Sequence, residues 1–122
     1  MVKTKSLKQY DLEERTFDFA RGVRNLVKKL PKVVQFSDDV RQLLRASGSV
    51  AANYIEANES LSKKDFLHRA KICRKEAKES RLWLRLIETK DIEIQKEQKQ
   101  LAQEALELTK IFGSIVNGPK FF

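Results

Sequence analysis

One stretch of the sequence, residues 63–88, constrains the fold more than any other. Apolar or small residues recur there in unbroken steps of four and three, at Phe66, Ala70, Cys73, Ala77, Ser80, Leu84 and Ile87. This spacing puts all of them on one side of an α-helix, which is the pattern of a helix in a bundle. The same stretch is crowded with Lys and Arg. It therefore predicts a helix with one face in a core and another face that carries positive charge.

Three further amphipathic segments flank this stretch. The first covers about residues 11–30 and ends before Pro31, because the residue before a proline disfavours the helical region. After a link over residues 31–36, Ser37 is a predicted N-cap of the second segment, which runs to about Asn58. Thr89 or Asp91 caps the last segment, and Gly118-Pro119 ends it.

Four amphipathic helices joined by short links predict an all-α fold, an antiparallel up-down-up-down four-helix bundle. No strand pattern competes with this prediction. The length of 122 residues suits one domain. We expect a flexible basic arm over residues 1–10, a single bundle domain over 11–118 and a short tail over 119–122.

The middle of the second segment is unusually rich in small residues. Gly48 inside a helix costs on the order of 1 kcal/mol relative to alanine. The expected compensation is the close approach of a neighbouring helix at Ala46, Gly48, Ser49 and Ala52. The alternative is a plain weak point in the helix.

The single cysteine, Cys73, lies on the apolar seam and excludes an intrachain disulfide. A cysteine at such a position acts as a small hydrophobic residue, and a reducing cytoplasm fits it. The first residues lack the apolar run of a signal peptide, and no run of 18 apolar residues predicts a membrane span. We expect a cytoplasmic protein without membrane contact.

The charge is strongly basic, with 25 Lys and Arg against 17 Asp and Glu. Much of it lies on the third helix, which favours a polyanion such as RNA or DNA as a partner. The candidate phosphate contacts are Lys63, Lys64, Arg69, Lys71, Lys75, Lys78 and Arg85. Two alternatives stay open: a solvated helix face balanced by neighbouring acids, and a surface that holds an acidic protein.

The third helix has a second apolar stripe, beside the seam. It contains Ile72, Trp83 and Leu86, with Leu82 close by. A small bundle rarely needs two apolar faces on one helix, so these residues predict a contact between subunits. The alternative is that Trp83 packs under the first helix of its own chain.

Catalytic and metal sites find no support in the residue pattern. A di-iron bundle needs Glu-x-x-His on two helices, whereas the one histidine, His68, does not follow a glutamate at that spacing. No Gly-rich phosphate loop or nucleophile with a base is present. We expect no enzymatic activity, no cofactor and no metal, and we expect Glu56, Glu76 and Glu79 to pair with Arg45, Arg74 or Arg81 between helices.

Two motifs resemble those of the 23S rRNA intervening-sequence family of four-helix-bundle proteins. The first is an arginine, a small serine-containing turn and Asn-x-x-Glu, and the second is Glu-x-x-x-Ser followed by a leucine. The matching residues are Arg45, Ser49, Asn53 and Glu56, then Glu76, Ser80 and Leu84. The resemblance implies a homopentamer of four-helix bundles, and a relation to the basic, nucleic-acid-binding accessory variability determinant of diversity-generating retroelements.

The sequence thus predicts a non-enzymatic, basic, oligomeric bundle that binds RNA or another nucleic acid through its third helix. The alternative is a scaffold or accessory subunit that holds an acidic or nucleic-acid-processing protein.

Overall fold

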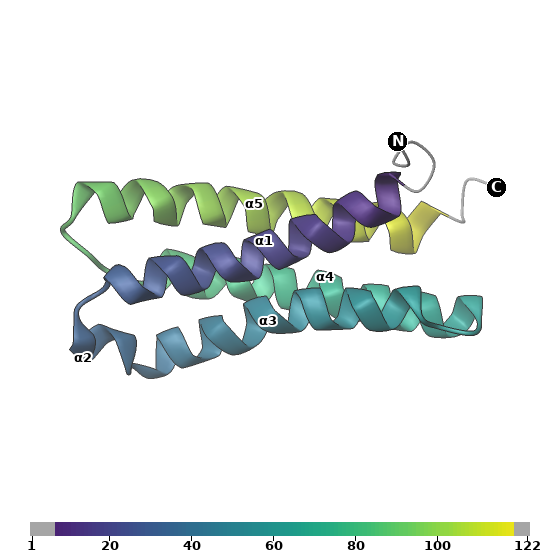
Figure 1. The fold of residues 1–122 in the computed structure, drawn as a ribbon, viewed down its shortest axis with the longest axis horizontal. Helices are drawn as coiled ribbons and strands as arrows, with labels where there is room; N and C mark the ends of the chain where they lie inside the picture. Colours follow the sequence, from purple (N-terminus) through teal and green to yellow (C-terminus); the bar gives the residue numbers. More distant parts are fainter. Residues whose placement is uncertain (1–6, 119–122) are drawn as a thin grey trace.

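A computed structural model describes residues 7–118, and these residues form helices joined by short links (Figure 1). The helices are α1 (Leu7–Lys29), α2 (Lys32–Gln35), α3 (Asp38–Asn58), α4 (Lys63–Leu86) and α5 (Ile92–Asn117). The fold class is all-α, as predicted. Residues 1–6 of the expected arm and the tail over 119–122 lie outside the described residues.

Two boundaries differ from the prediction. Helix α1 begins at Leu7 rather than near Asp11, so residues 7–10 of the expected arm belong to the helix. The link over residues 31–36 contains the one-turn helix α2. Pro31 stands directly before it, where its fixed φ and missing N–H suit a helix start.

The helices pack in a closed arrangement around one core. Helix α4 packs against α3 and α5, and α1 covers the opposite side by packing against the same two helices. Figure 1 shows the four long helices running along the long axis of the molecule. The four long helices all contribute to the largest fully buried side chains, for example Phe19, Leu43, Leu84 and Phe112.

The predicted seam on α4 is confirmed. Its members Ala70, Cys73, Ala77, Ser80 and Leu84 are all fully buried. Cys73 acts as a small hydrophobic residue, and its Sγ lies 3.5 Å from the carbonyl oxygen of Val50 on α3. Burial raises the pKa of Cys73 to about 12, so the thiol stays protonated near neutral pH.

Serine or aspartate side chains cap three of the described helices, and those of α3 and α5 are the predicted ones. Ser37 Oγ accepts from the Val40 N–H, and Ser62 Oγ accepts from the Asp65 N–H. Asp91, rather than Thr89, caps α5. These bonds satisfy N–H groups that have no partner inside the helix.

Gln98 occupies a seam position of α5 where the apolar pattern is interrupted. Its Nε2 donates to the carbonyl oxygens of Leu84 at 2.5 Å and Ile87 at 2.7 Å. These carbonyls belong to the end of α4, where backbone acceptors lack helical partners. The polar residue therefore ties the end of α4 to the start of α5.

The small-residue segment of α3 meets a side chain of α1. Arg24 donates from Nη2 to the carbonyl oxygen of Leu44 at 3.0 Å and from Nη1 to Ser47 Oγ at 3.2 Å. A Cβ on Gly48 would lie 3.0 Å from Arg24 Nη2. The predicted close approach is therefore correct for Gly48, but the contact is one arginine, and Ala52 is exposed.

The motif residues join α3 to α4. Arg45 donates to Glu76 at 3.2 Å and to Glu79 at 2.9 Å, and the hydrogen bond that Glu76 accepts is the main reason that the pKa of Arg45 lies above its ordinary value. Glu76 is almost fully buried. Among residues 12–118, whose side chains the structure describes, Arg45 and neither Arg74 nor Arg81 pairs with these carboxylates.

Three other motif residues have different roles. Ser80 is buried and donates back to the carbonyl oxygen of Glu76. Asn53 donates to Ser49 Oγ at 2.9 Å and to the Ser49 carbonyl oxygen. Glu56 is exposed on α3, and no ion pair of its side chain occurs among residues 12–118.

We expect Gly48→Ala to stabilise the protein by about 0.5–1 kcal/mol only when Arg24→Ala is also present. Alanine favours the helix, but in the native background its Cβ must displace the hydrogen-bonded Arg24 tip. Urea unfolding of the two single variants and the double variant measures this coupling. An equal effect of Gly48→Ala in both backgrounds would show that Arg24 does not select the glycine.

We expect Arg45→Ala to lower the free energy of unfolding by about 2 kcal/mol, because it leaves the nearly buried Glu76 carboxylate without its cation. Arg41→Ala is the matched control. It removes an exposed pair with Asp38 and should cost less than about 0.5 kcal/mol. Equal losses in the two variants, measured by urea unfolding, would contradict this account.

Candidate functional site

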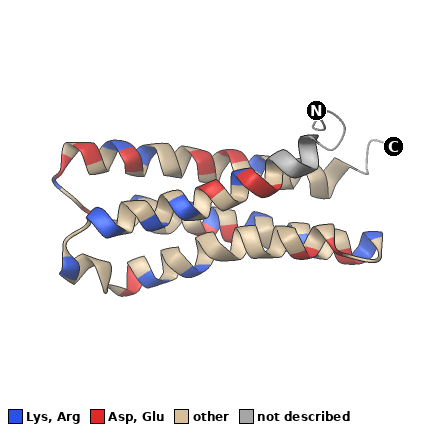
Figure 2. Ribbon diagram, in the orientation of Figure 1, with Lys and Arg blue, Asp and Glu red and all other residues tan. Residues whose placement is uncertain are grey.

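The exposed side of α4 carries a row of cations opposite the buried seam. Exposed residues recur there in the same steps of four and three, at Lys64, His68, Lys71, Lys75, Lys78, Leu82 and Arg85. We call Lys64, Lys71, Lys75, Lys78 and Arg85 the basic stripe. On α1 and α5, by contrast, acidic and basic residues are mixed (Figure 2).

The basic stripe contains no acid. The acids of α4 lie elsewhere, since Glu76 and Glu79 face Arg45 on α3 and Asp65 lies in the first turn. Within residues 12–118, no ion pair involves a cation of the stripe. A regular row of exposed cations on a rigid helix can contact successive phosphates of a polyanion.

Two other predicted phosphate contacts lie off this row. Lys63 is exposed in the first turn of α4, next to the stripe. Arg69 is half-buried between helices, where its Nη1 donates to Asn53 Oδ1 at 2.8 Å. The structure thus places Arg69 with the residues that join α3 to α4 and not with the stripe.

The predicted interface residues differ in exposure. Ile72 and Trp83 are half-buried, and Trp83 packs against the core of its own chain. The indole Nε1 of Trp83 is buried and has no acceptor among the described residues. Leu86 and Leu82 are 48% and 46% exposed, and Leu82 interrupts the basic stripe between Lys78 and Arg85.

Sequence reasoning missed an apolar surface on α2. Val33 and Phe36 are 81% and 83% exposed, in and directly after this one-turn helix. Figure 1 places α2 at the end of the bundle where α4 ends and α5 begins, and Ile92 is also exposed there. The segment reads as a simple link in the sequence, so only its short helix reveals that it presents these side chains.

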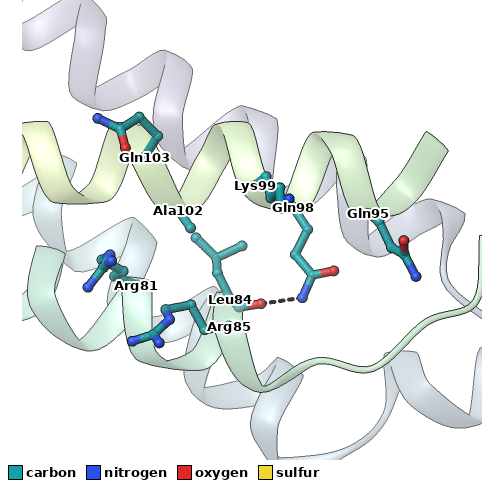
Figure 3. Close-up of a pocket in the computed structure, with 8 residues that line it drawn as sticks. All are labelled: Arg81, Leu84, Arg85, Gln95, Gln98, Lys99, Ala102 and Gln103. Atoms are coloured by element: carbon teal, nitrogen blue, oxygen red, sulfur yellow. Dashed lines mark hydrogen bonds between the residues drawn. The ribbon is translucent and has the colours of Figure 1, made fainter. Parts of the chain in front are cut away.

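A cleft of about 430 Å³ opens between the end of α4 and the start of α5. Its polar lining consists of Arg81, Arg85, Gln95, Gln98, Lys99 and Gln103 (Figure 3). Arg85 belongs to both the cleft and the basic stripe. No spacing pattern in the sequence predicts this cleft, because its residues come from two helices.

A larger hollow of about 750 Å³ lies at the opposite end of the bundle. Its walls include Leu12, Tyr54, Phe66 and Ile115, and its cation Arg15 already pairs with Glu104 and Glu107 on α5. This hollow offers mainly apolar contact and no uncompensated charge of its own.

Metal and membrane sites were also sought in the described part of the chain. Residues 12–118 contain no group of three or more His, Cys, Asp or Glu side chains that could hold a metal ion. None of the five described helices combines the length and the apolar character that a membrane crossing requires.

Comparison with known proteins agrees with the motifs. The family model for the 23S rRNA-intervening sequence protein matches residues 8–114. The fold is similar, with a TM-score of 0.74 and 27% identity, to the crystal structure of a protein of unknown function from the S23 ribosomal protein family of Bacteroides thetaiotaomicron; the match covers 86% of this chain and 97% of that one. No curated protein matches the sequence. The chain therefore belongs to the 23S rRNA-intervening sequence protein family.

Proposed function

We propose that the protein is a non-enzymatic RNA-binding protein that holds structured RNA on the basic stripe of α4. The observation that carries the proposal is the row of five exposed cations without an acid among them. The description of the family refers to 23S rRNA, which supports RNA over DNA as the polyanion. The proposed compartment is the cytoplasm, because its reducing conditions keep a single buried cysteine in the thiol form.

The stripe has the length and chemistry for this task. At 1.5 Å per residue, Lys64 to Arg85 spans about 30 Å, which is enough to contact several phosphates. Lysine contacts with phosphate position a nucleic acid without reading its sequence. The proposed selectivity is therefore for the shape of the RNA rather than for its sequence.

We propose in addition that each chain is an up-down-up-down bundle and that five chains form a ring. The short links between long helices support the antiparallel order. The half-exposed Leu86, which lies beside the stripe, supports a subunit contact along α4. A ring would present several stripes at once and convert weak phosphate contacts into avidity.

A second candidate function is the binding of an acidic protein. Leu82 within the stripe and Leu86 beside it favour this candidate, because apolar side chains among cations are typical of protein interfaces. Binding to a partner that survives nuclease treatment would favour a protein partner over RNA.

We expect the variant with Lys71→Gln, Lys75→Gln and Lys78→Gln to bind structured RNA more weakly and with less dependence on salt. Each lost phosphate contact should reduce the slope of log K against log salt by about 0.7–0.9, so the triple variant should lose roughly 2. Fluorescence anisotropy over a range of salt concentrations measures both quantities.

The matched control replaces three exposed lysines away from the stripe, Lys90, Lys96 and Lys110, with glutamine. It removes the same net charge, so it distinguishes RNA binding at the stripe from a general attraction of RNA to a basic protein. Equal effects of both triple variants, or a salt slope near zero in the native protein, would refute the stripe as the RNA site.

We expect Leu86→Glu to reduce the mass of the oligomer with little loss of helix content, because a charge would enter the proposed subunit contact. Ile55→Glu on α3 is the control, since Ile55 is similarly exposed at 53%. Light scattering and circular dichroism give the two readouts. An unchanged mass for Leu86→Glu would exclude this part of α4 from the interface.

A further inference from the structure

We propose that the cleft between α4 and α5 binds one nucleotide that carries an exocyclic amino group, either free or as a unit of an RNA strand. Arg81, Arg85 and Lys99 would hold the phosphate, and the amide oxygens of the cleft would accept from the amino group of the base. The RNA form of this inference rests on the proposed function; the free-nucleotide form does not.

The cations of the cleft are not neutralised by their surroundings. No acid is among the described residues that line it. Arg81, Arg85 and Lys99 form no ion pair within residues 12–118. Three cations without an acid beside them along one cleft offer a phosphate group charge that this chain does not already neutralise.

Arg81 supplies a second, independent sign of an absent partner. Its Nε is buried and has no acceptor among the described residues. Buried donors are nearly always bonded, so such a group needs an explanation. Because this atom is itself covered by the protein, a phosphate in the cleft would be held by the outer nitrogens of Arg81 and by Arg85, which stands one helical turn away on the same side of α4 (Figure 3).

The glutamines of the cleft indicate that the ligand carries hydrogen-bond donors. The Nε2 group of Gln95 donates to the Thr89 carbonyl oxygen, that of Gln98 to Leu84 and Ile87, and that of Gln103 to Glu107. These bonds fix which end of each amide is the donor. The amide oxygens are left as acceptors, which suits the N–H donors of adenine and cytosine but not the O4 acceptor of uracil.

The cleft also has a suitable size and floor. Its volume of about 430 Å³ lies near the lower end of the range for small-ligand sites. Leu84 and Ala102 form its apolar part. A single base with its phosphate fits these limits, whereas a folded RNA segment would have to stay outside on the stripe.

The test is calorimetric titration of the full-length protein with adenosine 5′-monophosphate, uridine 5′-monophosphate and inorganic phosphate. We expect the adenine nucleotide to bind at least tenfold more tightly than phosphate and several-fold more tightly than the uracil nucleotide. Ala102→Leu should weaken binding at least tenfold, because it fills the cleft without removing charge. Ala52→Leu, on the exposed face of α3, should change it less than twofold.

A second variant keeps the proposal testable if Ala102→Leu does not fold. Arg85→Gln removes an exposed cation and should weaken nucleotide binding while the circular dichroism spectrum stays native. Adenine nucleotide binding no tighter than that of phosphate, or unchanged by both Ala102→Leu and Arg85→Gln, would overturn the proposal.

Single-stranded oligoadenylate and oligouridylate distinguish the two sources of the nucleotide. A preference for oligoadenylate that Ala102→Leu abolishes indicates a unit of RNA, and binding of the free nucleotide without this preference indicates a free nucleotide. The variant with Lys71, Lys75 and Lys78 replaced by glutamine should keep its affinity for the free nucleotide. If the native protein bound the free nucleotide but bound no RNA, the stripe would be rejected and the cleft would stand as a site for a free nucleotide.

Discussion

Every part of this structure depends on the packing of α4 between α3 and α5. The buried seam of α4 is built mainly from Ala70, Cys73, Ala77 and Ser80, whose side chains are small. Small residues let the two neighbouring helices come close, while most of the bulky core side chains, such as Phe19, Leu43 and Phe112, come from the other helices, with Leu84 as the large residue that α4 adds. Because the seam uses only one side of α4, three other sides of the helix remain for polar tasks.

Those three sides divide the positive charge of α4. Towards α3, Arg69 is bonded to Asn53, and the acids Glu76 and Glu79 are bonded to Arg45. Towards α5, the stem of Arg74 packs over Gly113, and Arg81 and Arg85 line the cleft. Only the outward side carries the row of exposed cations, which His68 and Leu82 interrupt. The cations of this helix therefore lie in three different environments and do not form one surface.

This division bears on how the protein could bind RNA. Exposed lysines are flexible point charges and suit the phosphates of a structured RNA. The arginines of the cleft carry planar guanidinium groups, which suit a phosphate. The amide groups of its glutamines are held by hydrogen bonds, and this fixed orientation suits the recognition of one base. Arg85 belongs to both the basic stripe and the cleft, so the proposed RNA site and the proposed nucleotide site adjoin each other at this residue.

Local patterns in the sequence are sufficient to predict the four long helices, the caps of α3 and α5, and the seam of α4. The steps of four and three on α4, the serine before α3 and Asp91 before α5 are local signals, and local signals survive folding when a helix packs on one face. They also identified the exposed lysines and the motifs of the family. The sequence could not predict the helical turn of α2, since one turn carries no periodicity and depends on its packing.

Which partner each cation contacts depends on how the helices pack together. Ser49, Asn53 and Arg69 form one group because α3 and α4 lie side by side, and Arg45 rather than Arg74 or Arg81 reaches the two glutamates for the same reason. The cleft likewise exists only where the end of α4 meets the start of α5. Helical periodicity states which side of a helix a residue occupies, but the contacts across that side are fixed by the rotation and offset of the neighbouring helix, which no single segment encodes.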